Sequence, residues 1–156
     1  MIRTFLLPCF LLPFTTLAQA EPKKEVLAVI DRFFSAMTSR DTAAMALTMV
    51  REGSLHVASL DGSKAARSVP HTDYLVMLAK GTERLVERYW DPAVRVDGTI
   101  ASVTMPYDFH VDGKFSHCGI DLFTLVKGPD GWRIAGVAYT RQVENCPPSP
   151  LGSLKP

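Results

Sequence analysis

The stretch TIASVTMPYDFHVDGKFSHCGIDLFTLVKGPDGWRIAGVAYTR, residues 99–141, predicts three consecutive β-strands joined by tight turns. Residues 100–111 carry an apolar or aromatic side chain at every second position, which is the spacing of a strand. Residues 115–126 are rich in β-branched and aromatic side chains and form the second strand. A turn containing glycine and proline then leads into the third strand, residues 132–141. We therefore expect an antiparallel meander at the centre of the fold.

The first turn of the meander sets the strand pairing, because Asp112-Gly113 suits a two-residue hairpin loop. In that register Asp108 lies directly opposite His117, and alternation places Asp121 on the same face. The side chains predicted on this face are Asp108, Phe115, His117, Asp121, Phe123, Trp132, Ile134, Gly136, Ala138 and Thr140. Those predicted on the opposite face are Met105, Tyr107, Phe109, Ile120, Leu122, Val137 and Tyr139.

Both predicted faces of the meander are substantially apolar. Such a sheet is expected to have helices against one side and a partner against the other. A slip of one residue at either turn would reverse the assignment of faces.

The sequence before the meander predicts three helices and three shorter strands. Apolar residues at helical spacing indicate a first helix, and Asp41 is a suitable N-cap for the second. The expected helices are residues 23–38, 42–49 and 73–80, and the expected strands are residues 54–60, 83–90 and 94–96. Residues 61–70 are expected to form a polar loop. The order of elements predicts an α+β domain.

The first twenty residues have the pattern of a signal peptide. Arg3 is the positive n-region, residues 5–17 are the apolar h-region, and Ala18-Gln19-Ala20 is a small-residue cleavage site. We therefore expect cleavage after Ala20 and a periplasmic or secreted protein, with no stable membrane anchor. The remaining chain is predicted to be one domain, residues 21–146, followed by an irregular proline-rich tail, residues 147–156.

The charge balance argues against a nucleic-acid partner. Arg3 accounts for one of the 17 basic residues, so the other 16 balance the 16 acidic residues of the predicted mature chain. No basic tract is present, whereas nucleic-acid binding depends on such charge. The four histidines show no spacing typical of a zinc site, so we expect no metal and no cofactor.

Two cysteines, Cys118 and Cys146, remain after the predicted cleavage. An even pair in an oxidising compartment indicates a disulfide, which would tie the tail to the middle strand of the meander. The alternative is two unpaired thiols.

Several of these motifs resemble the NTF2-like superfamily. They are the helix–Arg40-Asp41–helix start, the segment from Tyr107 to Lys114 with its continuation in residues 116–119, and Gly131-Trp132-Arg133-Ile134. The resemblance is strongest to the secreted bacterial branch described as putative lumazine-binding or SnoaL-like. It implies a cone in which a curved antiparallel sheet wraps a long N-terminal helix, with two shorter helices and a pocket at the open end. It also implies a homodimer through the outer face of the sheet.

The strongest candidates for chemistry are His117, Asp108 and Asp121. An imidazole oriented by Asp108 beside a second carboxylate could act as a general acid or base near neutral pH. Burial in an apolar pocket would raise the pKa of Asp121, as a proton donor requires. The alternative is a buried polar cluster with a structural role. The side chains expected around the pocket are Tyr74, Tyr89, Phe115, Phe123, Trp132 and Thr140.

These observations support three hypotheses of different classes. The first is an exported domain whose pocket binds a small apolar or heterocyclic molecule. The second is an enzyme of isomerase, dehydratase or cyclase type that uses a His–Asp pair in the same pocket. The third is a protein-interaction module acting through the outer face of the sheet. The superfamily contains both enzymes and binding domains, so the fold alone does not select a reaction.

Overall fold

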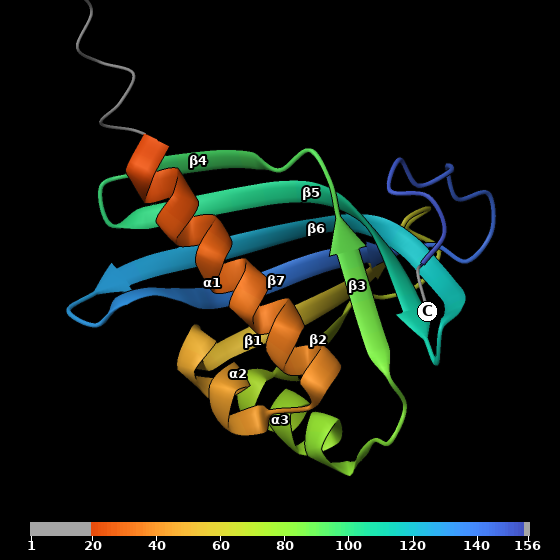
Figure 1. Cartoon of the computed structure of the whole chain (residues 1–156), viewed down its shortest axis with the longest axis horizontal. Helices are drawn as coiled ribbons and strands as arrows, with labels where there is room; N and C mark the ends of the chain where they lie inside the picture. The colour runs from red at the N-terminus through yellow and green to blue at the C-terminus, as the bar shows by residue number, and fades with distance from the viewer. Residues whose placement is uncertain (1–19, 155–156) are drawn as a thin grey trace, which may run out of the picture.

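The computed structural model describes residues 20–154 as three helices and seven strands (Figure 1). The helices are α1 (Ala20–Ser39), α2 (Thr42–Thr48) and α3 (His71–Lys80). The strands are β1 (Met49–Ser59), β2 (Arg67–Pro70), β3 (Leu85–Tyr89), β4 (Ala93–Asp97), β5 (Ile100–Val111), β6 (Lys114–Gly128) and β7 (Gly131–Arg141). All predicted elements are present. The predicted signal peptide lies outside the described residues, apart from Ala20.

All the strands belong to one sheet with the order β2-β1-β7-β6-β5-β3, and β4 also pairs with β5. Every pairing is antiparallel except that of β1 with β7, which is parallel. The short strand β2 lies within the predicted polar loop and pairs along the edge with β1. Four residues are too few for a recognisable alternating pattern.

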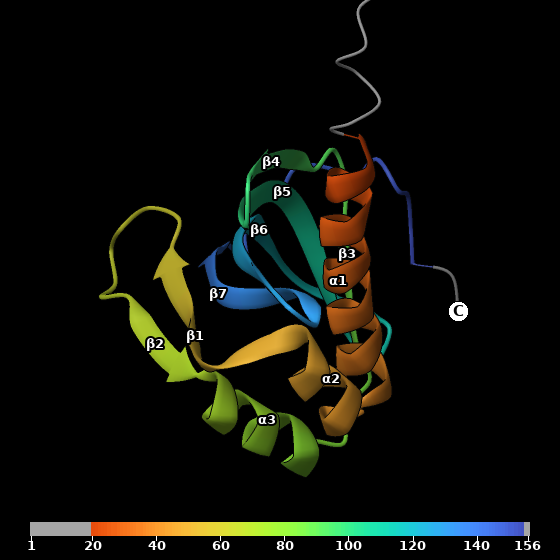
Figure 2. The same ribbon diagram turned by 90° about the vertical axis from the view of Figure 1, so that its left-hand side faces the viewer.

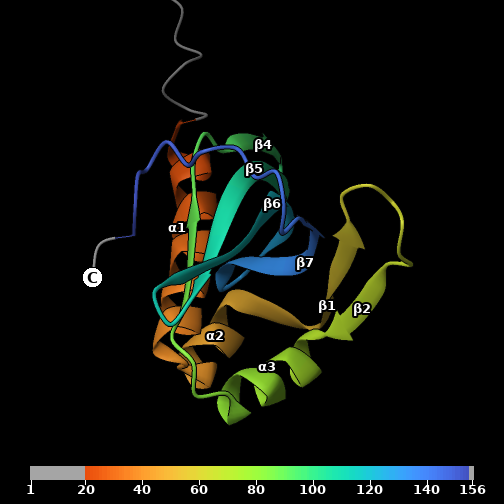
Figure 3. The ribbon, with the colours of Figure 1, turned by 90° about the vertical axis from the view of Figure 1, so that its right-hand side faces the viewer.

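Helix α1 lies across the concave face of the curved sheet (Figures 2 and 3). Its apolar residues recur at helical spacing and are buried against the sheet. The buried set is Val26, Val29, Ile30, Phe33, Phe34, Ala36 and Met37. The predicted cap of α2 is confirmed, because Asp41 Oδ1 accepts a hydrogen bond from the Ala44 backbone N–H at 2.9 Å. The expected cone, with helix inside and sheet outside, is therefore the observed architecture.

The first hairpin contains a β-bulge that changes the predicted faces. The two-residue loop is confirmed, since Val111 pairs with Lys114 and His110 with Phe115. Phe109 then pairs with His117, so Ser116 is an extra residue on β6. The predicted pairing of Asp108 with His117 is therefore wrong, and Asp108 pairs with Cys118. The bulge moves Tyr107 and Phe109 to the concave face and Asp108 to the outer face.

A second bulge has the same effect on β7. The predicted loop at residues 129–130 is confirmed by the pairing of Gly128 with Gly131. The register shifts between Leu125 with Ile134 and Thr124 with Gly136, so Ala135 is extra. Trp132 and Ile134 lie on the concave face as predicted, but Val137 and Tyr139 replace Gly136, Ala138 and Thr140 there.

A glycine is required at position 119, because the Tyr107 ring and the Thr140 carbonyl group lie close to its backbone. A Cβ atom at Gly119 would lie 2.8 Å from the Tyr107 ring and would also clash with the Thr140 carbonyl oxygen. We expect Gly119→Ala to lower the free energy of unfolding by about 2 kcal/mol, because a fixed backbone atom cannot move aside. Urea denaturation would measure this loss. Gly128→Ala is the control, since nothing lies within 4 Å of its Cβ position. Equal losses for the two variants would contradict the prediction.

The predicted disulfide between Cys118 and Cys146 is present. It attaches the C-terminal tail to the outer side of β6, at the right-hand end of the sheet in Figure 1. The tail is also held by Arg88, whose Nη2 donates a hydrogen bond to the Gly152 carbonyl at 2.9 Å. None of the helices within residues 20–154 combines the length and apolar character that a membrane span requires.

Candidate functional site

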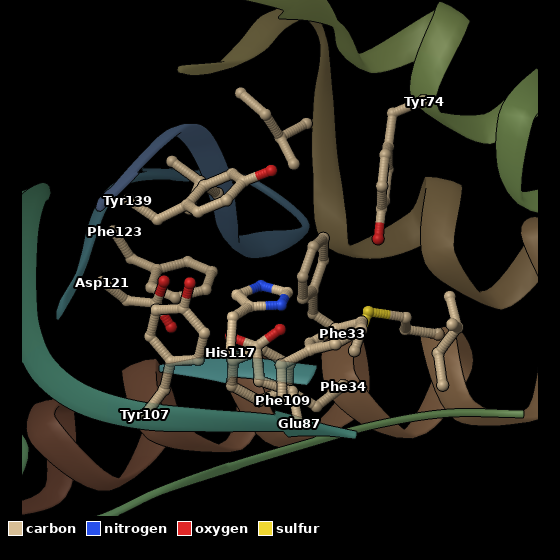
Figure 4. A pocket seen from close by; sticks show the side chains of 14 residues that line it. Phe33, Phe34, Tyr74, Glu87, Tyr107, Phe109, His117, Asp121, Phe123 and Tyr139 are labelled. Atoms are coloured by element: carbon tan, nitrogen blue, oxygen red, sulfur yellow. The ribbon is translucent and has the colours of Figure 1, made fainter. Parts of the chain in front are cut away.

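A cavity of about 150 Å³ lies between α1, α3 and the concave face of the sheet (Figure 4). Its walls are mostly aromatic and aliphatic side chains, with a few polar groups among them. The lining residues are Phe33, Phe34, Met37, Leu55, Tyr74, Leu85, Glu87, Tyr107, Phe109, His117, Asp121, Phe123, Val137 and Tyr139. An apolar cavity with a small number of polar groups is the usual form of a small-molecule site.

Two carboxyl groups, those of Glu87 on β3 and Asp121 on β6, meet in this cavity. Burial raises the pKa of Asp121 to about 7, although a hydrogen bond with Glu87 partly opposes the shift. Burial also raises the pKa of Glu87 well above its ordinary value, and the charge of Asp121 raises it further. A hydrogen bond between two carboxyl groups requires a proton on one of them. The pair therefore holds a proton near neutral pH.

Asp121 is buried, yet hydrogen bonds satisfy only part of its carboxyl group. The residue is 3 % exposed. Its Oδ2 is buried and has no hydrogen-bond partner among residues 20–154. A buried polar atom without a partner has a free-energy cost. The atom is thus available to a ligand group that enters the cavity.

His117 contacts the cavity as a neutral imidazole. Burial, with the charge of Arg141 as a smaller cause, lowers the pKa of His117 to about 4. Its ring stacks on Phe109 with centroids 4.8 Å apart, and its Nδ1 lies 3.0 Å from Ser116 Oγ. At neutral pH the imidazole can accept or donate a hydrogen bond, and it adds no charge to the cavity.

Three tyrosines complete the polar part of the lining. Burial raises the pKa of Tyr74, Tyr107 and Tyr139, so all three are protonated at neutral pH. The Tyr107 hydroxyl donates to the Thr140 carbonyl at 2.9 Å. The side chains of Tyr74 and Tyr139 extend into the cavity with their hydroxyl ends leading (Figure 4).

Four of the residues predicted for the site line the cavity, namely Tyr74, His117, Asp121 and Phe123. His117, Asp121 and Phe123 follow the alternation of β6 after the bulge, and Tyr74 projects from the apolar side of α3. These placements did not depend on the pairing with β5. They could be predicted from the order of residues within β6 and within α3.

Asp108 lies outside the cavity, on the outer face of β5. Its carboxylate forms two hydrogen bonds with Arg88, Nε to Oδ1 at 2.8 Å and Nη2 to Oδ2 at 2.6 Å. Burial opposes ionisation of Asp108, but hydrogen bonds from Arg88 and Ser149, together with the charge of Arg88, hold its pKa below the ordinary value. The predicted orientation of His117 by Asp108 is therefore wrong. The nearest imidazole to Asp108 is that of His110, whose Nδ1 lies 3.5 Å from Oδ1.

The other predicted pocket residues also lie elsewhere. Phe115 is 50 % exposed and packs edge-on against His110, because it precedes the bulge. Tyr89 packs against Phe34 and its hydroxyl donates to Asp31 at 2.7 Å. Trp132 is buried in the core, where its Nε1 donates to Glu25 at 3.1 Å. The Thr140 hydroxyl accepts a hydrogen bond from the Ile120 backbone N–H.

Glu87 is the acidic residue of the cavity lining that was not among the predicted site residues. Leu85, Glu87 and Tyr89 alternate along β3, and Leu85 and Glu87 both face the cavity. A glutamate within an otherwise apolar alternation is the signal that could have located it. Among residues 20–154, the His, Cys, Asp and Glu side chains form no group of three or more that could hold a metal ion.

Residues 21–140 match the protein family described as putative lumazine-binding. The match covers nearly all of the α1-to-β7 region that forms the cavity. A sequence search of the curated proteins finds no match.

Solved structures show the same fold at low sequence identity. An NTF2-like protein from Cytophaga hutchinsonii has a TM-score of 0.66 at 10 % identity, covering 76 % of this chain and 97 % of its own. An NTF2-like protein with a cystatin-like fold from Novosphingobium aromaticivorans has a TM-score of 0.66 at 18 % identity, covering 83 % and 87 %. An NTF2-like protein from Streptomyces avermitilis, described as a putative dehydratase, has a TM-score of 0.65 at 17 % identity, covering 80 % and 98 %. These likenesses extend to the fold only.

Proposed function

This chain belongs to the putative lumazine-binding family of NTF2-like proteins, and on that basis we propose that its cavity binds a small apolar or heterocyclic molecule. The observation that carries the proposal is an aromatic-lined cavity that contains a carboxyl pair, a neutral imidazole and two inward-pointing tyrosines. The apolar walls supply binding energy through burial, and the few polar groups orient the ligand.

The volume of the cavity limits the size of the ligand that it can enclose. An engineered apolar cavity of about 150 Å³ holds one benzene molecule. A cavity of about 150 Å³ here accommodates one ring or a compact group of similar size. A larger ligand, such as the two-ring lumazine, would extend beyond it toward solvent.

A variant that fills the cavity tests this proposal. We expect Leu85→Trp to weaken the binding of lumazine and of single-ring aromatic compounds at least about tenfold, because the indole occupies the space that the ligand needs. Isothermal titration calorimetry would measure the affinities. Val86→Trp is the control, since its side chain points away from the cavity on the same strand. If none of these compounds binds the wild-type protein, or if both variants bind equally well, the proposal is wrong.

A second candidate is an acid–base enzyme of the isomerase, dehydratase or cyclase type. The specific observation that favours it is the buried Glu87–Asp121 pair beside His117, since a carboxyl group with a pKa of about 7 can give or take a proton near neutral pH. In this arrangement Glu87 takes the role that was predicted for Asp108, namely to orient His117. His117→Ala would abolish turnover of a bound substrate without unfolding the chain, and normal turnover by that variant would eliminate the candidate.

We also propose export and dimerisation. Export is supported by the signal-peptide pattern and by the disulfide, which an oxidising compartment preserves. Dimerisation is supported by large apolar side chains on the outer face of the sheet, where Ile120 and Leu122 are each 40 % exposed. Native mass spectrometry of a periplasmic extract tests both proposals. A full-length monomer with residues 1–20 attached would contradict them.

A further inference from the structure

We propose that the ligand of this cavity is a small organic cation, an alkylated or protonated amine, with the Glu87–Asp121 carboxyl pair as its counter-charge. This inference rests on the proposed function, because it names the chemical class of ligand that the same cavity takes. It follows from the charges, the aromatic walls and the hydrogen bonding of the lining residues.

The groups of the cavity lining that can be charged at neutral pH are all acidic. Its 14 lining residues include two carboxyl groups and neither lysine nor arginine. His117 is neutral at physiological pH because burial lowers its pKa to about 4. The carboxyl pair therefore has no cationic partner within the lining. A buried charge without a partner is costly, so the pair retains a proton when the cavity holds no cation.

Aromatic rings surround the carboxyl pair. Half of the lining residues are phenylalanine or tyrosine. Phe33 stands at the centre of this wall, with centroid distances of 6.2 Å to Tyr74 and 5.7 Å to Phe123. The faces of aromatic rings attract cations, and cages of such rings bind methylated ammonium groups in other proteins. A neutral aromatic ligand would gain from the same walls by burial but would leave the carboxyl pair without a counter-charge.

Asp121 Oδ2 provides the second, independent observation. The atom is buried and has no hydrogen-bond partner within the described chain. A cation entering the cavity supplies a partner for this oxygen and replaces the proton that the two carboxyl groups share. The displaced proton leaves to solvent, so the net charge of the occupied cavity stays near that of the empty one. A trimethylammonium group is also compact enough for a cavity of about 150 Å³.

Choline and its neutral carbon isostere dimethylbutanol are matched probes for this proposal, because they differ mainly in the charge. We expect choline to bind at least about tenfold more tightly than dimethylbutanol at pH 8. Isothermal titration calorimetry of the full chain would measure both affinities. Equal affinity for the two probes would overturn the cation inference, while the binding of both would leave the proposed small-molecule function intact. If neither of these probes binds and the aromatic panel also fails, the proposed function itself is wrong.

The pH dependence of choline affinity provides a further test. Because choline displaces a proton, its affinity should rise with pH by up to about tenfold per unit below the pKa of the pair, and that of dimethylbutanol should not rise. Other titratable or charged groups act on the pair or on the residues around it. They are Arg40, Arg67, Tyr74, Tyr107, Asp108, His117, Tyr139 and Arg141. The tyrosines, whose pKa values are raised by burial, do not titrate between pH 6 and 8, and His117 and Asp108 titrate below that range. A choline affinity that is constant over this range would contradict the proton exchange.

Substitution of each carboxyl group tests whether the preference for choline depends on the Glu87–Asp121 pair. Asp121→Asn and Glu87→Gln should each reduce the preference for choline over dimethylbutanol by at least about tenfold. Glu52→Gln is the matched control, because it removes the same formal charge from an exposed position on β1. Thermal unfolding of each variant would verify that it is folded. An unchanged preference in both cavity variants would overturn the assignment of the carboxyl pair as the counter-charge.

Discussion

Asp121→Asn is expected to be more stable than the wild-type protein above pH 7, by about 4 kcal/mol, and to lose this advantage as the pH falls toward 4. Burial raises the pKa of Asp121 from its ordinary value of 3.8 to about 7. Between these values the folded protein holds a proton that the unfolded chain has released. The stability that this group contributes is thus fully present below pH 4 and is lost as the pH rises to 7. Asparagine removes the titration and can still donate a hydrogen bond to Glu87.

Urea denaturation of both proteins at several pH values would measure this difference. The control is Glu52→Gln, since an exposed carboxyl group should change stability by less than about 0.5 kcal/mol at every pH. A difference between Asp121→Asn and wild type that is constant from pH 4 to 8 would show that Asp121 does not titrate as described. Burial still raises the pKa of Glu87 in the variant, so some decline of stability with pH remains.

Cys146→Ser is expected to lower the free energy of unfolding by about 3–4 kcal/mol. The disulfide joins residues separated by 28 positions, and closing a loop of that length removes about this much conformational free energy from the unfolded chain. The variant also frees the tail, which then depends on contacts such as the hydrogen bond from Arg88 to Gly152. Urea denaturation under oxidising conditions would measure the loss.

Reduced wild-type protein is the control for the disulfide. It should unfold at the same urea concentration as Cys146→Ser, and the reductant should not change the variant. Cys118→Ser should cost slightly more, because Cys118 is 5 % exposed and its side chain packs within the sheet. A loss below about 1 kcal/mol for Cys146→Ser would contradict the prediction.

The secondary structure was largely predictable because its signals are local. The helical spacing of residues in α1, the cap at Asp41 and the turn residues Asp112-Gly113 each act over a few positions. Both hairpin loops were placed correctly for this reason. The short edge strand β2 was missed because its stability comes from pairing with β1 and not from a pattern of its own.

The cavity was only partly predictable because two bulges intervene. Each bulge adds one residue to one strand, so every later side chain on that strand changes face relative to its neighbour. Ser116 moves Tyr107 and Phe109 into the cavity and Asp108 out of it. Ala135 does the same for Val137 and Tyr139. No turn residue marks either position in the sequence.

By itself, the sequence determined the α+β class, the order of elements, the two hairpin loops and the cysteine pair, because these depend on neighbouring residues or on simple counting. Tertiary structure alone decided which polar groups share the cavity. Glu87 and Asp121 come from strands that do not pair with each other, and they meet because the sheet curves around α1. The bulges accommodate that curvature, and its position depends on packing between distant parts of the chain. The acid pair is therefore a product of the folded shape and not of any motif.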